Sequence, residues 1–156
     1  MTEAETLTVD QELVRLAAEA FKPIPDTNDN HTVAAAVRSK YGETFVAFNV
    51  YHFTGGPCAE LAVLGTAAAG GVLASEIATI VAVARRPGNV KFIVNPCGRC
   101  RQVLLDYNPD INVIYLGGNG NEVVAKAKDL MPFAYTWPDG NTGRNDAASK
   151  AAETHS

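Results

Sequence analysis

The three cysteines of this chain are confined to two short segments, and their placement is the strongest constraint that the sequence puts on the fold. The first segment is Cys58–Glu60 (CAE), and the second is Pro96–Cys100 (PCGRC). Each segment is expected to open a helix, because Pro57 suits the first position of a helix and apolar residues recur at helical spacing from Val103 onward. The fold therefore has to bring two helix N-termini together.

Three cysteine sulfurs around one point are a ligand set that zinc prefers. Helix N-termini stabilise thiolates, so we expect Cys58, Cys97 and Cys100 to bind one Zn2+ per subunit. Three protein ligands leave the fourth tetrahedral position for a water whose pKa falls to about 7, as in catalytic zinc sites. Glu60 is then the expected proton carrier. Arg99 is expected to offset the excess negative charge of the thiolates by hydrogen bonds to sulfur.

Other interpretations of the same residues stay open. The cysteines can be small buried apolar residues, or the ligands of a closed structural zinc site with His52 as the fourth ligand. Glu60 can be an ordinary first-turn glutamate. Residues two apart on a regular helix do not share a face, so Cys58 and Glu60 meet at one site only if that site lies ahead of the helix end.

Composition limits the domain organisation. The chain has 156 residues, of which 47% are hydrophobic and 19% charged, and this predicts one globular domain. We assign residues 1–137 to that domain. Residues 138–156 are rich in Gly, Asn, Asp, Ser and Ala without a large apolar side chain, so they are expected to form a polar tail outside the core.

Charge and hydropathy limit the partners. The net charge of −4 argues against a nucleic-acid partner, since single-strand binders need basic and aromatic surface, and it favours a small substrate. The apolar stretch from Leu61 to Ala74 is shorter than the roughly 20 residues of a membrane span. The segment Met1–Glu5 lacks the features of a secretory signal, so the cytoplasm is the expected location.

The order of the expected elements predicts a three-layer α/β/α arrangement on a mixed sheet. A helix with an apolar face follows the capping-box spacing of Thr8–Gln11 and runs to Pro23, and Val123–Leu130 is expected to include a short helix. The two cysteine helices are expected to end near Gly70 and Asn108. The expected strands are Thr32–Ser39 and Thr44–Val50, which form a hairpin, followed by Ile77–Ala84, Phe92–Val94 and Ile111–Leu116.

The two cysteine segments and their flanks resemble the cytidine deaminases. The resemblance rests on Asn49–Glu60, on Pro96–Leu104 and on Leu130–Pro132 followed by Tyr135-x-Trp137. The pattern C-x-E followed by P-C-x-x-C is the signature of zinc nucleobase deaminases. Within this family the chain is similar to the all-cysteine, small-subunit enzymes, and most of all to the blasticidin S deaminases.

This resemblance implies a cytidine deaminase-like fold with a mixed five-stranded sheet, and a homotetramer. It implies hydrolytic deamination of the cytosine ring of the nucleoside antibiotic blasticidin S, and so a role in antibiotic resistance. The alternative is deamination of cytidine or deoxycytidine in pyrimidine salvage. In the implied reaction water adds at C4, and Glu60 takes a proton from this water, gives it to N3, and later protonates the departing ammonia. Other rivals are a polynucleotide deaminase and a non-catalytic zinc module.

The resemblance also implies the residues that contact the substrate. In the family, a phenylalanine and an Asn-x-Glu pair hold the base and the ribose hydroxyls. Here Tyr51 stands in place of that glutamate, which departs from simple ribose recognition and matches the blasticidin S enzymes. The last aromatic residue is expected to close the pocket of the same or a neighbouring subunit. The expected substrate-binding residues are Phe48, Asn49, Tyr51, Ala59, Pro96 and Trp137.

Overall fold

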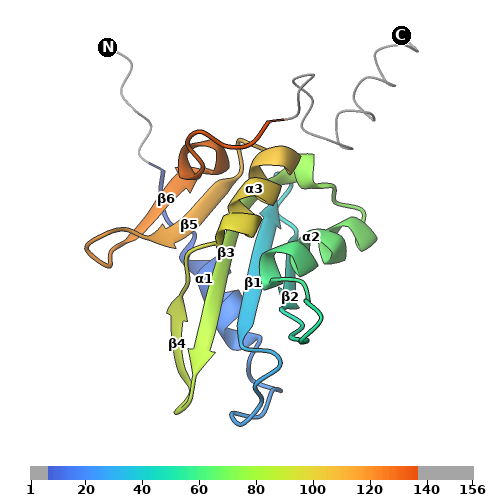
Figure 1. Ribbon diagram of the computed structural model, residues 1–156, viewed down its shortest axis with the longest axis vertical. Helices are drawn as coiled ribbons and strands as arrows, with labels where there is room; N and C mark the ends of the chain where they lie inside the picture. Colours follow the sequence, from blue (N-terminus) through green and yellow to red (C-terminus); the bar gives the residue numbers. More distant parts are fainter. Residues whose placement is uncertain (1–6, 137–156) are drawn as a thin grey trace.

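The computed structural model describes residues 7–136, which form a mixed sheet with helices on both of its faces (Figure 1). The expectations for Trp137, for the tail 138–156 and for Met1–Glu5 lie outside the described residues. Within the described part of the chain, no helix has the length and apolarity needed to cross a membrane.

The sheet has six strands, one more than expected. The strand order is β2-β1-β3-β5-β6, and β4 pairs with β3. All neighbouring pairs are antiparallel except β3 and β5, which are parallel, so the sheet is mixed as predicted. The strands are β1 (Val33–Ser39), β2 (Thr44–Phe48), β3 (Ile77–Arg86), β4 (Val90–Ile93), β5 (Asn112–Leu116) and β6 (Glu122–Lys126).

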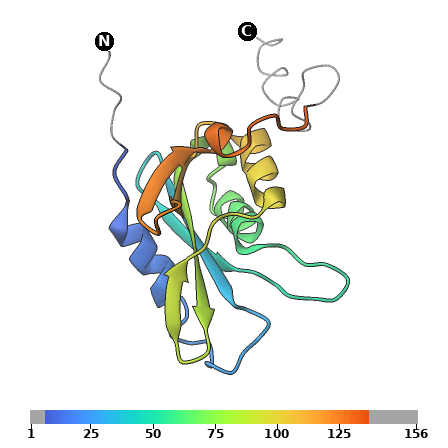
Figure 2. The ribbon, with the colours of Figure 1, turned by 60° about the vertical axis from the view of Figure 1, so that its left-hand side comes forward.

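The helices lie on opposite sides of this sheet, which confirms the three-layer prediction. Figure 2 shows α1 on one face, with α2 and α3 together on the other. Side chains alternate along a strand, so Ala34 and Ala36 of β1 pack toward α1, whereas Ala35 and Val37 pack toward the other two helices. The helices are α1 (Gln11–Glu19), α2 (Ala59–Ala69) and α3 (Gly98–Tyr107), with short 3₁₀ helices η1 (Ala74–Glu76) and η2 (Ala127–Leu130).

The first helix begins later than the capping-box spacing suggested. Its N-cap is Asp10, whose carboxylate accepts a hydrogen bond from the backbone N–H of Leu13 at 3.0 Å. The same carboxylate pairs with Arg38 of β1 at 2.6 Å. Asp10 therefore both starts α1 and ties it to the sheet.

The extra strand is β6, in the segment where a helix was expected. The turn Gly117–Asn121 closes on itself through a hydrogen bond from Gly117 N–H to Asn121 O, and Gly120 takes a positive φ of 80°. This tight turn folds β6 back on β5 as a hairpin. Within the segment Val123–Leu130, where the short helix was expected, only η2 is helical.

One edge of β3 is divided between two strands, and this division positions the site. Along its other edge, β3 pairs with β1 from Ile77 to Ala84. On the divided edge, Thr79 and Ile80 pair with β5, whereas Val83 to Arg86 pair with β4. The chain leaves β4 at this split and enters α3, and ligand sites in α/β sheets form at such places.

Candidate metal centre

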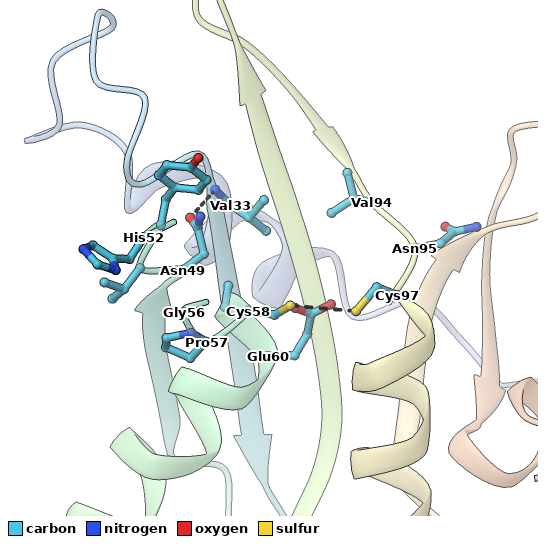
Figure 3. Close-up of a pocket in the computed structure, with 13 residues that line it drawn as sticks. Val33, Asn49, His52, Gly56, Pro57, Cys58, Glu60, Val94, Asn95 and Cys97 are labelled. Atoms are coloured by element: carbon cyan, nitrogen blue, oxygen red, sulfur yellow. Dashed lines mark hydrogen bonds between the residues drawn. The ribbon is translucent and has the colours of Figure 1, made fainter. Parts of the chain in front are cut away.

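The three cysteine sulfurs meet at the N-termini of α2 and α3. Cys58 is the N-cap of α2, Cys97 is the N-cap of α3, and Cys100 lies in the first turn of α3. Their Sγ atoms all lie within 4.8 Å of one another, and the distance from Cys58 to Cys97 is 3.8 Å. Figure 3 shows Cys58 and Cys97 pointing toward each other, with Glu60 beside them.

This geometry fits a zinc ion. Zinc binds thiolate sulfur at about 2.3 Å in tetrahedral geometry, so two sulfur ligands are expected to lie about 3.8 Å apart. The separation between the Cys58 and Cys97 sulfurs matches this value. In the described part of the chain, the ligand group at this point consists of the three cysteines, and His52 does not belong to it. The arrangement is therefore that of an open, three-ligand site rather than a closed one.

The loop before α2 is shaped by two glycines. Gly55 has a positive φ of 95°. A Cβ on Gly56 would lie 1.8 Å from the carbonyl oxygen of Val50, so a larger residue cannot occupy that position without moving the backbone. Pro57 precedes the N-cap instead of taking the first helical position, which corrects the expected helix start by two residues.

Glu60 shares the site with Cys58 because Cys58 is not helical. Cys58 has extended backbone angles, with φ −63° and ψ 157°, so the rule for residues two apart on a helix does not apply. Glu60 is 6% exposed. Burial raises its pKa, and opposing effects from its own backbone N–H, Cys100 and Arg99 do not cancel that shift.

The thiols differ in their electrostatic surroundings. Burial acts to raise the pKa of Cys97, but hydrogen bonds from the Cys100 backbone N–H and from the thiols of Cys100 and Cys58 outweigh it and leave this pKa lowered. Burial, followed by the negative charge of Glu60, raises the pKa of Cys100. The Cys97 sulfur accepts from the Cys100 N–H at 3.4 Å and so caps its own helix.

Arg99 lies between the two cysteine segments. Its Nη2 donates to the carbonyl oxygen of Gly56 at 2.9 Å and to the Cys58 sulfur at 3.4 Å. The hydrogen bond with Cys58 is the main cause that raises the pKa of Arg99. This guanidinium therefore joins α3 to the loop before α2 and brings a positive charge to the sulfur cluster.

A pocket of about 270 Å³ opens at the cluster. Glu60, Asn49, Tyr51 and Ala59 are among the expected site residues that line it. The full lining is Val33, Asn49, Val50, Tyr51, His52, Gly56, Pro57, Cys58, Ala59, Glu60, Val94, Asn95 and Cys97.

Two expected substrate contacts do not line this pocket. Phe48 packs on the α1 side of the sheet, edge-on to Phe21 with ring centroids 5.2 Å apart, because alternation along β2 turns it to that face. Pro96 instead lines a small side cavity of about 10 Å³ next to Glu60. Its carbonyl oxygen accepts from Arg101 Nε at 2.9 Å.

Hydrogen bonds to the backbone hold the side-chain amide of Asn49 in place. Its Oδ1 accepts hydrogen bonds from the backbone N–H groups of Thr32 and Val33, both at 2.9 Å. The His31 ring, through Nδ1, contacts the Asn49 carbonyl oxygen at 2.7 Å. Both lone pairs of the amide oxygen are thus engaged, and Nδ2–H is the polar group that Asn49 can offer to a ligand.

Three residues of the pocket wall lie outside the segments on which the sequence resemblance rests. Val33 and Val94 belong to strand segments and carry no signal that separates them from core residues. Asn95 does carry a sequence signal, because it is a polar residue between an apolar strand and the Pro-Cys segment.

A three-sulfur cluster and a buried carboxylate on this layered fold form the arrangement of the zinc nucleobase deaminases. No protein-family model matches the chain. It is 36% identical to the blasticidin-S deaminase of Bacillus cereus over 134 residues, which cover 81% of this chain and 92% of that protein. It is 30% identical to the cytidine deaminase of Halalkalibacterium halodurans over 134 residues, which cover 84% of this chain and 97% of that protein.

A solved structure agrees with these relatives. The crystal structure of cytidine deaminase from Burkholderia pseudomallei matches with a TM-score of 0.64 and 30% identity, covering 82% of this chain and all of that one. The chain therefore belongs to the cytidine deaminase family, and it is a hydrolytic deaminase with a three-cysteine group that can bind a metal ion.

Proposed function

We propose that this enzyme removes the amino group from the cytosine ring of blasticidin S, with Zn2+ held by Cys58, Cys97 and Cys100. The observation that carries the proposal is the three-sulfur cluster beside the buried carboxylate of Glu60 at the edge of the pocket. The net reaction adds water at C4 and releases ammonia. When bound, zinc supplies a Lewis acid that lets water act as a nucleophile near neutral pH.

Glu60 moves the protons. Its carboxylate accepts a proton from the attacking water and delivers it to N3 of the ring. It then takes the proton of the new C4 hydroxyl group and gives it to the amino group, so that ammonia leaves as the C4–N bond breaks and the C4 carbonyl forms. Burial suits this role, because a raised pKa brings the carboxyl group closer to the pH at which it must both accept and donate.

Backbone groups are proposed to hold the base. Pro96 O uses one lone pair for Arg101 and has a second for the amino group of the ring. Ala59 is the first residue of α2, where the backbone N–H has no partner within the helix and can donate to the C2 carbonyl of the base. Trp137 is proposed to close the pocket, and it lies outside the described residues.

The sugar side of the pocket favours blasticidin S. Tyr51 lies at the rim and is 65% exposed. Among the residues that line the described pocket, Glu60 is the one carboxylate, so the rim offers no second carboxylate to ribose hydroxyls. Asn49 Nδ2–H instead donates to a sugar oxygen. The identity with the Bacillus cereus blasticidin-S deaminase supports the same choice.

Deamination of cytidine or deoxycytidine is the second candidate. It is supported by the relative from Halalkalibacterium halodurans and by the structure from Burkholderia pseudomallei, both of which are cytidine deaminases. The two candidates share every step at the cytosine ring and differ in the group attached to N1.

An ultraviolet assay with both substrates separates the candidates. We expect kcat/KM for blasticidin S to exceed that for cytidine by at least about tenfold, which corresponds to 1.36 kcal/mol of transition-state binding. Tyr51→Glu should shift the ratio toward cytidine, and Tyr51→Phe serves as the matched control that keeps the ring. A wild-type preference for cytidine would assign the enzyme to pyrimidine salvage.

A homotetramer is the proposed assembly. The exposed positions of α2 include Gly65, Thr66, Ala68 and Ala69, which are small and uncharged, and Phe53 in the loop before α2 is 86% exposed. Uncharged apolar surface of this kind favours contact with another subunit. Light scattering on the purified protein should give four times the mass of the chain, and a monomer would contradict the proposal. The free cysteines suit the reducing cytoplasm, the proposed location.

A further inference from the structure

The loop that carries Pro96 and Cys97 begins at the split in the sheet. The last hydrogen bond of the loop segment to β3 runs from Val94 N–H to Ala82 O at 3.0 Å. Beyond it the chain turns away from β3. Proline has no N–H, so Pro96 cannot continue a strand ladder.

Asn95 bridges this gap with its side chain. Its Oδ1 accepts from the Leu116 N–H at 2.7 Å, and its Nδ2 donates to the Leu116 carbonyl oxygen at 2.9 Å. Leu116 is the last residue of β5. Both backbone polar groups of Leu116 are therefore satisfied by one amide side chain, which takes the place of a neighbouring strand. In Figure 3 the Asn95 side chain points away from Cys58 and Glu60.

Pro96 and Asn95, which are adjacent in the loop, form hydrogen bonds with different parts of the protein. Arg101 holds the Pro96 carbonyl, but it belongs to the helix that follows the loop, so this bond does not tie the loop to the sheet. Among the hydrogen bonds of the described residues, the pair from Asn95 links the loop to β5. Asn95 therefore ties the segment that directly precedes Cys97 to β5.

We infer that Asn95 is a positioning residue for the metal centre. It positions the sulfur of Cys97 and the carbonyl of Pro96 by pairing with β5, and it is not itself a metal ligand. A primary amide meets this requirement because it offers one donor and one acceptor in the spacing of a peptide group. The inference rests on the proposed zinc site and adds a residue that sets its geometry.

Metal competition on the holoenzyme tests this role. With Asn95→Ala, the affinity for zinc should fall about tenfold in competition with a chromophoric chelator, as is typical when a group that orients a metal ligand is lost. Asn95→Ser, which can keep one of the two hydrogen bonds, should give a smaller loss. The cobalt-substituted Asn95→Ala protein should also show altered thiolate-to-metal absorption, because the ligand geometry changes.

Asn108→Ala is the matched control. Asn108 also donates through its side chain to backbone oxygens, those of Ala74 and Ile77 at 3.1 and 3.2 Å, but at the far end of α3. This variant should lose thermal stability while keeping the zinc affinity and the cobalt spectrum of the wild type. Equal zinc affinity and equal spectra in the Asn95 and Asn108 variants would overturn the inference. Failure of the wild type to bind zinc or cobalt through sulfur would instead remove the proposed function.

Discussion

Replacing Glu60 with glutamine removes the proposed proton carrier and leaves the side-chain volume nearly unchanged. Glu60 is the one carboxylate among the residues that line the described pocket. The His52 ring also lines it, with its Nδ1 hydrogen-bonded to the Thr54 hydroxyl and its ring tilted against that of Phe53, the two centroids 4.5 Å apart. Glu60 is therefore the carboxylate on which the proposed proton transfer depends. We therefore expect a loss at the upper end of the range for general acid–base catalysis, about 10⁴-fold in kcat, or about 5.4 kcal/mol.

Turnover and metal content have to be measured on the same Glu60→Gln protein. Deamination is followed by the change in ultraviolet absorbance of the cytosine ring, and zinc by elemental analysis. The zinc content should equal that of the wild type, because the three sulfurs are untouched. Glu76→Gln serves as the control, since Glu76 lies in η1 away from the pocket and should keep full activity. A zinc-loaded Glu60→Gln enzyme with turnover within tenfold of the wild type would refute the proposed role.

Three further predictions concern charge, metal and pH. Arg99→Ala should lower zinc affinity about tenfold in chelator competition, with Arg99→Lys intermediate, because the hydrogen bond to the Cys58 sulfur is lost. Zinc at 1,000 times its Kd should raise the free energy of unfolding by about 4.1 kcal/mol in denaturant titrations, and Cys97→Ser should abolish that gain. The hydrogen bond with Arg38 holds the pKa of Asp10 below its ordinary value, so the stability it contributes is present above the unfolded-state pKa and is lost as pH falls through the folded-state pKa. Asp10→Asn, which keeps a capping oxygen, should cost about 1 kcal/mol at neutral pH and flatten this acid dependence in denaturant titrations.

Local sequence patterns were sufficient to predict most strands of the sheet. The hairpin of β1 and β2 and the long buried β3 appear where alternation and β-branched runs predicted them. The exception is β6. Val123 and Val124 fit a strand as well as a helix, and the deciding element is the tight turn at Gly117–Asn121, which folds β6 back on β5.

The composition of the site could be predicted, but the bonds that hold it could not. The cysteine segments carry their chemistry in the residue types themselves. Arg85, for example, donates to the carbonyl oxygens of Ile24 and Pro25 and lies over the ring of Phe21. Bonds between a side chain and a distant backbone depend on tertiary placement, and no local spacing reports them. The two hydrogen bonds between the Asn95 side chain and the Leu116 backbone also depend on tertiary placement.

The charge balance of the proposed zinc site gives a physical reason for both ligand segments to start helices. Three thiolates and one Zn2+ sum to about −1, which weakens the metal as a Lewis acid. The N-termini of α2 and α3 each add about +0.5 near the sulfurs, and Arg99 adds a full positive charge next to Cys58. These contributions together exceed the deficit, so the negative charge of Glu60 can be accommodated beside the cluster. In a three-cysteine site built on strand residues the helix contributions would be missing, so Arg99 would offset only the cluster and the negative charge of Glu60 would stay uncompensated.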